Sequence, residues 1–208
     1  MIKKQVISAI ITIYVVGCFL QNILAVKTFS VFGLPLTTGG TLISWIVFAC
    51  MDIITELCGK KTAIKIFTAT MLGNILWNMI CQIAIAFPGT NQFVSECYAV
   101  VLGTGWRITI ASAAAFWIGN YINSSIMNRM RYEHGDNKYC LRAVVSTVFG
   151  QAVDNLLFYI IAFSPLGVNA VEMEWKSIFT VAILTTALET ALETVLSLVT
   201  KRIVAELR

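Results

Sequence analysis

Residues 41–61, TLISWIVFACMDIITELCGKK, decide how this chain folds. Most of the stretch is apolar, and about 20 such residues are enough to cross the hydrocarbon core of a bilayer as a helix. Two carboxylates, Asp52 and Glu56, interrupt it, and Gly59 with two lysines ends it. Charged side chains at membrane depth are costly and usually face a protein interior or a wet cavity. The stretch therefore predicts a transmembrane helix with an acidic face turned towards other helices.

The composition of the whole chain is that of an integral membrane protein. Of its 208 residues 58% are hydrophobic and 12% are charged, against about 25% charged in soluble proteins. So few polar residues cannot coat a surface exposed to water. A net charge of +4 would point to nucleic acid in a soluble chain. Here we expect the lipid bilayer as a partner and no nucleic acid, and we expect one membrane domain over 1–208 with no sizeable soluble domain.

Six apolar segments are long enough to span the membrane. The first follows two lysines, but its apolar run is longer than that of a signal peptide, so we predict that it is a span. The segment 26–40, VKTFSVFGLPLTTGG, contains the helix breakers Pro and Gly and is predicted to be a loop or a short re-entrant piece. The prediction is an all-α bundle of six transmembrane helices, at 5–26, 38–58, 62–87, 105–126, 142–163 and 177–199.

Lysine and arginine are distributed unevenly between the two ends of these spans. Twelve of the 15 lie before the first span, between spans two and three, between spans four and five, or after span six. The other three are Lys27, Arg107 and Lys176. Cytoplasmic loops carry the excess of positive charge in membrane proteins. We therefore expect both termini in the cytoplasm, in a multi-pass protein of the cytoplasmic (inner) membrane.

Neither a metal site nor a catalytic site is indicated. The six cysteines are scattered without a C-x-x-C pair, which speaks against a zinc site and a disulfide framework. An intramembrane aspartyl protease using Asp52 and Asp154 would need a G-x-G-D motif, which the sequence lacks. We expect no cofactor, no metal and no enzymatic activity.

Polar side chains recur at helical spacing on every predicted span. Residues three or four apart share one face of a helix, and an acid near a helix centre in the bilayer costs about 2.5–3.5 kcal/mol. The acids at or near membrane depth are Asp52, Glu56, Asp154, Glu189 and Glu193. The amide, hydroxyl, aromatic and basic side chains predicted to line the same cavity are Asn22, Trp45, Phe48, Asn78, Arg107, Ser112, Asn123, Gln151, Asn155 and Phe158. The pattern predicts a bundle around a wet, acidic and amide-rich cavity.

Structural roles compete with binding roles for these residues. Amides on transmembrane faces often only join helices by hydrogen bonds, and buried acids can belong to ion pairs that hold two helices together. Glu56 lies close to the end of its span and could be in contact with water. Arg107 could cap the cavity or extend to the membrane interface. All these alternatives stay open at this point.

A short sequence pattern occurs in both the fourth and the fifth predicted spans. GNYIN (119–123) and GQAVD (150–154) both read glycine, amide, two apolar residues, then Asn or Asp. The two copies lie on oppositely directed helices, which suits a pseudo-twofold axis around a shared cavity, as in transporters with inverted repeats. Chance similarity is the competing explanation.

The side chains indicate what such a cavity binds. Carboxylates accept hydrogen bonds from adjacent donors, amides offer a donor and an acceptor, and aromatic rings stack on flat ligands. A neutral or cationic heteroaromatic ligand with an amidine-like edge fits all three, and a guanine-like base is one example. An anionic ligand would meet five acids and fits worse.

Several motifs together resemble the queuosine precursor transporter family, also known as vitamin uptake transporters. Two of them, D-x-x-T-E-x-x-G-x-x-x-A starting at Asp52 and S-T-x-x-x-Q-x-x-D starting at Ser146, are specific in combination. The resemblance covers about residues 20–200. It rests on QNILAVK (21–27), TTGG (37–40), DIITELCGKKTA (52–63), WRITIASAAAFWIGNYIN (106–123), LRAVVSTVFGQAVDNLLFYIIAF (141–163) and the acidic sixth span.

The resemblance implies import of a 7-deazapurine, such as queuine or the cyano or aminomethyl 7-deazaguanine, for tRNA modification. Residues that match the family's motif positions are Asp52, Glu56, Arg107, Ser112, Ser146, Gln151 and Asp154. The chain departs from the family at Asn123, where Asp is usual, and at Glu189, where Lys is usual. The greater acidity favours a cationic or larger precursor.

The mechanism is less constrained than the substrate class. We expect a cavity near the bilayer midplane that opens alternately to either side. Asp52, Gln151, Asp154 and Asn155 would bind the base edge. One of Glu56, Glu189 or Glu193 could carry a coupling proton, or transport could be facilitated diffusion. A homodimer is a further option that the sequence leaves open.

The main alternative is a substrate-binding component of an energy-coupling-factor vitamin importer, which would require a separate ATPase. Such components often carry A-x-x-x-A contact motifs in the first span. The first span here contains only Ala9 and Ala25, which disfavours this alternative.

Overall fold

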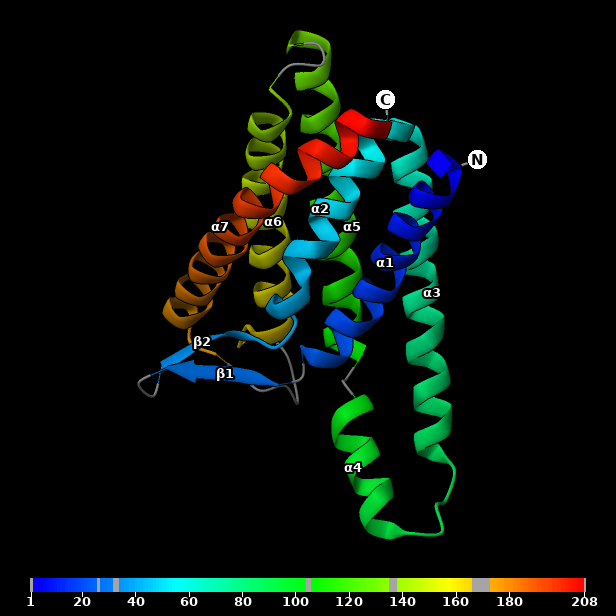
Figure 1. Cartoon of the computed structure of the whole chain (residues 1–208). Helices are drawn as coiled ribbons and strands as arrows, with labels where there is room; N and C mark the ends of the chain where they lie inside the picture. Colours follow the sequence, from blue (N-terminus) through cyan, green and yellow to red (C-terminus); the bar gives the residue numbers. More distant parts are fainter. Residues whose placement is uncertain are drawn as a thin grey trace.

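The structure, a computed structural model, describes residues 2–25, 27–31, 34–103, 106–134, 138–165 and 173–207. These residues form one helical bundle with a small β-hairpin at one end (Figure 1). The helices are α1 (Ile2–Leu24), α2 (Thr41–Cys58), α3 (Lys60–Ala86), α4 (Gln92–Leu102), α5 (Trp106–His134), α6 (Tyr139–Phe163) and α7 (Trp175–Leu207). The strands are β1 (Thr28–Val31) and β2 (Leu34–Thr38), which pair antiparallel. The predicted all-α class is confirmed for the bundle.

Helix α2, which contains the opening stretch of the sequence, lies at the centre of the bundle. It packs between α1 and α7 and also contacts α3, α5 and α6. Figure 1 shows the N and C termini together at one end, here called the terminal end, and the β-hairpin at the opposite hairpin end. Helix α2 therefore runs from the hairpin end at Thr41 to the terminal end at Cys58.

Burial in this bundle is inverted relative to a soluble protein. Asp52, Glu56 and Glu193 are at most 2% exposed. Ile183 and Leu198, by contrast, are 67% and 64% exposed on the outer surface of α7. Five helices are long and apolar enough to cross a membrane, namely Lys4–Leu24, Thr41–Cys58, Lys60–Ala86, Tyr139–Phe163 and Trp175–Leu207. The chain is therefore a multi-pass membrane protein.

Helix α5 contains the predicted span 105–126 but is more polar than the other long helices. Asn120, Asn123 and Ser124 lower its hydropathy, and all three are fully buried against neighbouring helices. Because α5 packs against α2, α3 and α6, much of its surface never meets lipid and need not be apolar. Six spans with both termini in the cytoplasm stay a prediction.

The segment 26–40 is not the loop or re-entrant piece that its Pro and Gly residues predicted. Most of it forms the β1–β2 hairpin, with Thr28 opposite Thr38 and Phe29 opposite Thr37. Its β-branched and aromatic residues favour strands, and Pro35 is tolerated because both strands are edge strands. Gly39 follows directly, and a Cβ there would lie 2.5 Å from the backbone oxygen of Leu24. A larger residue would push the hairpin off the end of α1.

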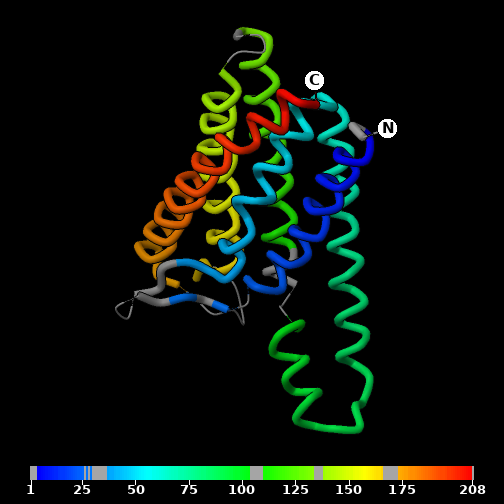
Figure 2. The backbone as a smooth tube through the Cα atoms, viewed as in Figure 1, coloured from blue at the N-terminus to red at the C-terminus, as the bar shows by residue number. Residues whose placement is uncertain are grey.

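Helix α4 was not predicted, because its 11 residues are too few to span a bilayer. Asn91 caps its N-terminus by accepting a hydrogen bond from the backbone N–H of Val94 at 3.1 Å. In Figures 1 and 2, α4 and the end of α3 extend beyond the hairpin end of the bundle. None of the residues of α4 is buried.

Candidate functional site

Two glycines let α5 and α6 approach closely at the middle of the bundle. A Cβ on Gly119 would lie 2.7 Å from Cβ of Asp154, and a Cβ on Gly150 would lie 2.8 Å from Cβ of Asn123. Gly119 thus packs on Asp154, four residues after Gly150, and Gly150 packs on Asn123, four residues after Gly119. This reciprocal packing agrees with the local pseudo-twofold predicted from the GNYIN and GQAVD pattern.

Polar side chains inside the bundle form three layers that follow one another along α2. The hairpin layer consists of Ser44, Asn155, Thr186 and Glu189. The middle layer consists of Asp52, Asn123, Ser146, Thr147, Gln151 and Glu193. The terminal layer consists of Glu56, Arg131 and Arg142.

In the hairpin layer, Glu189 of α7 is held by neutral donors. Its carboxylate accepts hydrogen bonds from the Ser44 hydroxyl and from Nδ2 of Asn155, the latter at 2.8 Å. A threonine chain ties the β-hairpin to the same place, since Thr37 bonds with Thr41 of α2 at 2.5 Å and with Thr185 of α7 at 3.1 Å. The hairpin therefore closes against α2 and α7 at the level of Glu189.

A pocket with an empty volume of about 470 Å³ lies beside this layer. Its polar lining includes Gln21, Asn22, Thr38, Thr41, Ser112, Asp154, Asn155 and Glu189. Aromatic rings from Phe116, Phe158 and Tyr159 complete it. No Lys or Arg is among its lining residues, all of which belong to the described part of the chain. We call it the acidic pocket.

A second pocket, with an empty volume of about 360 Å³, adjoins the acidic pocket. The two share Gln21, Asn22, Ser112 and Phe116, and the second extends to α3 through Asn74 and Asn78. Nδ2 of Asn22 also donates to Oδ1 of Asn74 at 2.8 Å, which joins α1 to α3. Asn22 therefore links two helices and lines a pocket, and its role in binding stays a prediction.

The middle layer is separate from both pockets. Asp52 Oδ1 accepts hydrogen bonds from Nδ2 of Asn123 at 2.7 Å and from the Ser146 hydroxyl at 3.5 Å. Glu193 accepts hydrogen bonds from the Thr147 hydroxyl at 2.5 Å and from Nε2 of Gln151 at 3.4 Å. All of these side chains are buried, so the middle layer is a closed polar network between α2, α5, α6 and α7.

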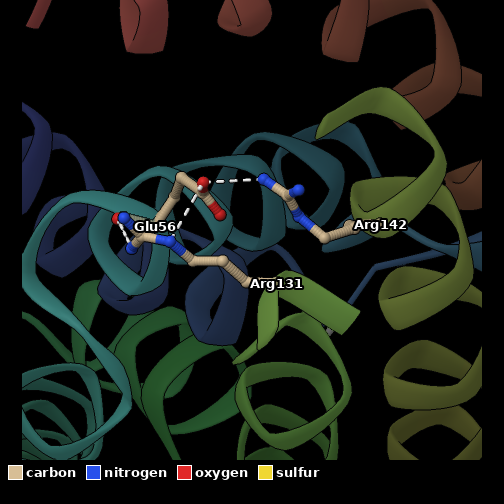
Figure 3. Close-up of polar contacts among 3 residues, drawn as sticks. All are labelled: Glu56, Arg131 and Arg142. Carbon is tan, nitrogen blue, oxygen red and sulfur yellow. Dashed lines mark hydrogen bonds and ion pairs between the residues drawn. The ribbon is translucent and has the colours of Figure 1, made fainter. Parts of the chain in front are cut away.

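The terminal layer is an ion-pair cluster, drawn in Figure 3. Oε1 of Glu56 lies 2.7 Å from a terminal nitrogen of Arg142 and 3.6 Å from Nε of Arg131. Arg131 also donates to the backbone oxygen of Glu56. Glu56 is only 2% exposed, so the alternative that it lies in water is wrong. The cluster joins α2, α5 and α6.

Sequence reasoning counted Arg131 and Arg142 as loop cations and missed them as partners of Glu56. The structure places Arg142 inside α6 with no exposed surface. A usable signal was present, because Glu56 and Arg142 both lie at the end of a predicted span on the same predicted side of the membrane.

The structure separates the predicted binding residues by location. The acidic pocket is lined by Asn22, Ser112, Asp154, Asn155, Phe158 and Glu189. Asn78 lines the adjoining pocket, and Asp52, Asn123, Gln151 and Glu193 belong to the middle layer. The side chain of Arg107 lies outside the described residues.

The two aromatic residues predicted on α2 do not line either pocket. Phe48 is fully buried, and its ring would lie 3.3 Å from a Cβ on Gly150. Trp45 is half-buried, and its indole N–H donates to the backbone oxygen of Leu42 at 3.0 Å. Both therefore contribute to packing around α2 in this structure.

Several pocket residues were not predicted as binding residues. Gln21, Thr38 and Gly40 belong to the QNILAVK and TTGG motifs, which sequence reasoning quoted only as marks of resemblance. Thr41 follows TTGG directly, and Tyr159 follows Phe158. The motifs themselves were the signal that could have identified them.

Comparisons with known proteins agree with the architecture. A family model described as "Putative vitamin uptake transporter" matches residues 38–203. The chain is 27% identical over 127 residues to "Queuosine precursor transporter" of Escherichia coli (strain K12), which covers 61% of this chain and 55% of that protein. It is 25% identical over 127 residues to "Probable queuosine precursor transporter" of Haemophilus influenzae, which covers 61% of this chain and 52% of that protein. The chain thus matches about half the length of these curated relatives, and no solved structure matches it.

Proposed function

We propose that this chain, which belongs to the family described as "Putative vitamin uptake transporter", carries a small molecule across the membrane. The acidic pocket is the observation that carries the proposal, because it combines carboxylates, amides and aromatic rings inside a multi-pass bundle. Such a lining binds and orients a flat polar ligand. The proposed role is transport and not catalysis, with no cofactor.

The proposed substrate is a 7-deazapurine precursor of queuosine. The names of two relatives and the pocket chemistry support this proposal independently. Asp154 or Glu189 can accept two adjacent N–H groups from a guanine-like edge, and Phe116, Phe158 or Tyr159 can stack on the ring. Because no Lys or Arg is among the described residues that line the pocket, we favour a precursor with a cationic substituent, such as the aminomethyl base or queuine, over the cyano base.

The proposed orientation places the terminal end in the cytoplasm, in a cytoplasmic (inner) membrane. The uneven distribution of Lys and Arg supports it, since the basic residues lie at the start of α1 and α3, around the connection of α5 to α6, and at the end of α7. The acidic pocket lies towards the hairpin end, and would then be nearer the outer side. Alternating access would require the terminal layer, which closes the other end here, to open.

A ligand panel on the purified full chain tests the substrate. The panel holds the cyano and aminomethyl 7-deazaguanines, queuine, guanine and several B vitamins, and thermal unfolding in detergent is measured with each. A bound ligand stabilises the folded protein, so a deazaguanine at 100 times its Kd should add about 2.7 kcal/mol. The Glu189→Gln variant should lose this shift. The Glu133→Gln variant, changed at an exposed surface pair, should keep it. Stabilisation by a vitamin alone would overturn the proposed substrate.

Reconstitution tests whether the chain works alone. Proteoliposomes that contain only this protein should take up the deazaguanine identified in the panel. Uptake that requires a co-purified ATP-hydrolysing partner would instead favour the energy-coupling-factor alternative.

A further inference from the structure

The middle layer holds two carboxyl groups from different helices in contact with each other. Asp52 of α2 and Glu193 of α7 lie within hydrogen-bonding reach, and each is 1% exposed. Two carboxylates this close in a buried site cannot both stay ionised without a counter-charge. What supplies that charge determines what the layer does.

The described protein groups around the pair supply hydrogen bonds but no positive charge. The donors to Asp52 and Glu193 are two amides and two hydroxyls, from Asn123, Gln151, Ser146 and Thr147. The buried Arg142 and the partly exposed Arg131 pair with Glu56 in the next layer. The middle layer therefore needs either a proton or a bound cation.

Two amide oxygen atoms in the layer distinguish these two options. Oδ1 of Asn123 and Oε1 of Gln151 are buried without a hydrogen-bond partner. The amide nitrogens of Asn123 and Gln151 contact the two carboxylates, so both amide groups adjoin the pair. A proton shared between the carboxyl groups leaves both amide oxygens unpaired. A metal cation coordinates carboxylate and amide oxygens together.

We propose that the middle layer is a binding site for one monovalent alkali cation, coordinated by Asp52, Asn123, Gln151 and Glu193. Hard cations select oxygen ligands of this kind. A divalent ion takes six or more oxygen ligands. In the described parts of the chain no three His, Cys, Asp or Glu side chains converge to hold such an ion.

The site would couple the cation to the packing of four helices. Its ligands come from α2, α5, α6 and α7, so a bound cation holds these helices together in the arrangement described here. If the proposed transport function is correct, this cation is a coupling ion for the acidic pocket, which lies about two helical turns away along α2. Cation binding itself does not depend on that function.

Thermal unfolding of the purified full chain, without any organic substrate, tests the site. Choline chloride is replaced stepwise by sodium, potassium or lithium chloride at constant ionic strength and pH. We expect a saturable rise in Tm with sodium or another alkali cation and none with choline. Glu193→Gln and Gln151→Leu should abolish the response, while Glu133→Gln, at an exposed surface pair, should keep it.

A gain-of-charge variant keeps the test decisive if a loss variant fails to fold. Asn123→Asp adds a carboxylate to the ligand set, so it should reach half-saturation at a lower cation concentration, about tenfold lower if the added charge contributes 1.4 kcal/mol. The proposal is overturned if no alkali cation differs from choline, because a proton alone then neutralises the pair. It is also overturned if only calcium or magnesium stabilises the protein. Because no substrate is present, neither result bears on the proposed transport substrate.

Discussion

Two glutamates of this bundle are equally buried but have opposite surroundings. Glu56 in the terminal layer is 2% exposed and lies between the guanidinium groups of Arg131 and Arg142. Glu189 in the hairpin layer is 3% exposed, and its described partners are the neutral side chains of Ser44 and Asn155. Only Glu189 lines a pocket.

The difference separates a structural acid from a binding acid. A buried carboxylate between two arginines has its charge balanced within the protein and holds three helices together. A buried carboxylate with neutral donors keeps an unbalanced charge, which costs several kcal/mol until something neutralises it. Beside a pocket, a ligand with N–H groups or a positive charge can do so. The comparison shows how Glu56 closes the bundle and supports ligand binding as the proposed role of Glu189.

The largest expected effect comes from removing the buried cation of the terminal layer. Arg142→Met leaves Glu56 without its fully buried partner, and breaking a buried ion pair costs about 3–5 kcal/mol. Thermal unfolding in detergent should show a large fall in Tm. The matched control is Arg129→Met, because Arg129 pairs with Glu133 on the surface with 84% of its side chain exposed.

A double variant checks that the loss comes from the unpaired charge and not from lost packing. Glu56→Leu together with Arg142→Met replaces the buried pair by apolar side chains, and should recover most of the stability lost in Arg142→Met. If the double variant is as unstable as the single one, the ion pair is not what Arg142 contributes.

The next largest effect concerns the glycine contact that brings the layers together. Gly119→Ala would place a Cβ 2.7 Å from Cβ of Asp154 and 2.9 Å from the backbone oxygen of Gly150. Neither neighbour can rotate away cheaply, so overpacking should cost about 1–3 kcal/mol in unfolding free energy. Gly73→Ala in α3 is the control, since its Cβ would meet only Phe19 at 3.5 Å. Equal stability of the two variants would contradict close packing of α5 on α6.

A smaller change in stability is expected at Glu189, although binding should be lost. Glu189→Gln removes a buried charge but keeps only one of the two acceptor oxygens used by Ser44 and Asn155, so stability should change by about 1 kcal/mol or less. Binding of the deazaguanine should weaken at least tenfold, measured by ligand-induced shift in Tm. The same substitution at Glu56 should instead lower Tm without a ligand. Identical behaviour of the two variants would remove the distinction between the two acids.

The sequence was sufficient to predict which residues face the interior. The spacing of four residues between Asp52 and Glu56, and between Glu189 and Glu193, fixes each pair on one helix face whatever the neighbours are. The repeated GNYIN and GQAVD pattern predicted a pseudo-twofold around a shared cavity, whereas its two glycines pack α5 directly on α6 in the structure.

The sequence could not predict which residues of different helices contact one another. The partner of Glu56 is set by how far α6 extends past the predicted start of its span, and α6 begins at Tyr139 so that Arg142 lies inside the helix. Asp52 is not in the acidic pocket because Asn123 of α5 and Ser146 of α6 bind its carboxylate in the middle layer. Such relations require the three-dimensional arrangement, because periodicity describes only one helix at a time.

The smallest expected change in stability comes from breaking an arginine–glutamate ion pair that lies on the exposed surface. Arg129 and Glu133 form an ion pair one turn apart on α5 at 3.2 Å, with side chains 84% and 54% exposed. Water solvates both charges when the pair breaks, so Glu133→Gln should change the unfolding free energy by about 0.5 kcal/mol or less. Unfolding at low and high salt should show a difference that disappears as screening increases. A loss as large as that of Arg142→Met would mean that burial is not what makes the terminal layer strong, and the contrast between Glu56 and Glu189 would then need another cause.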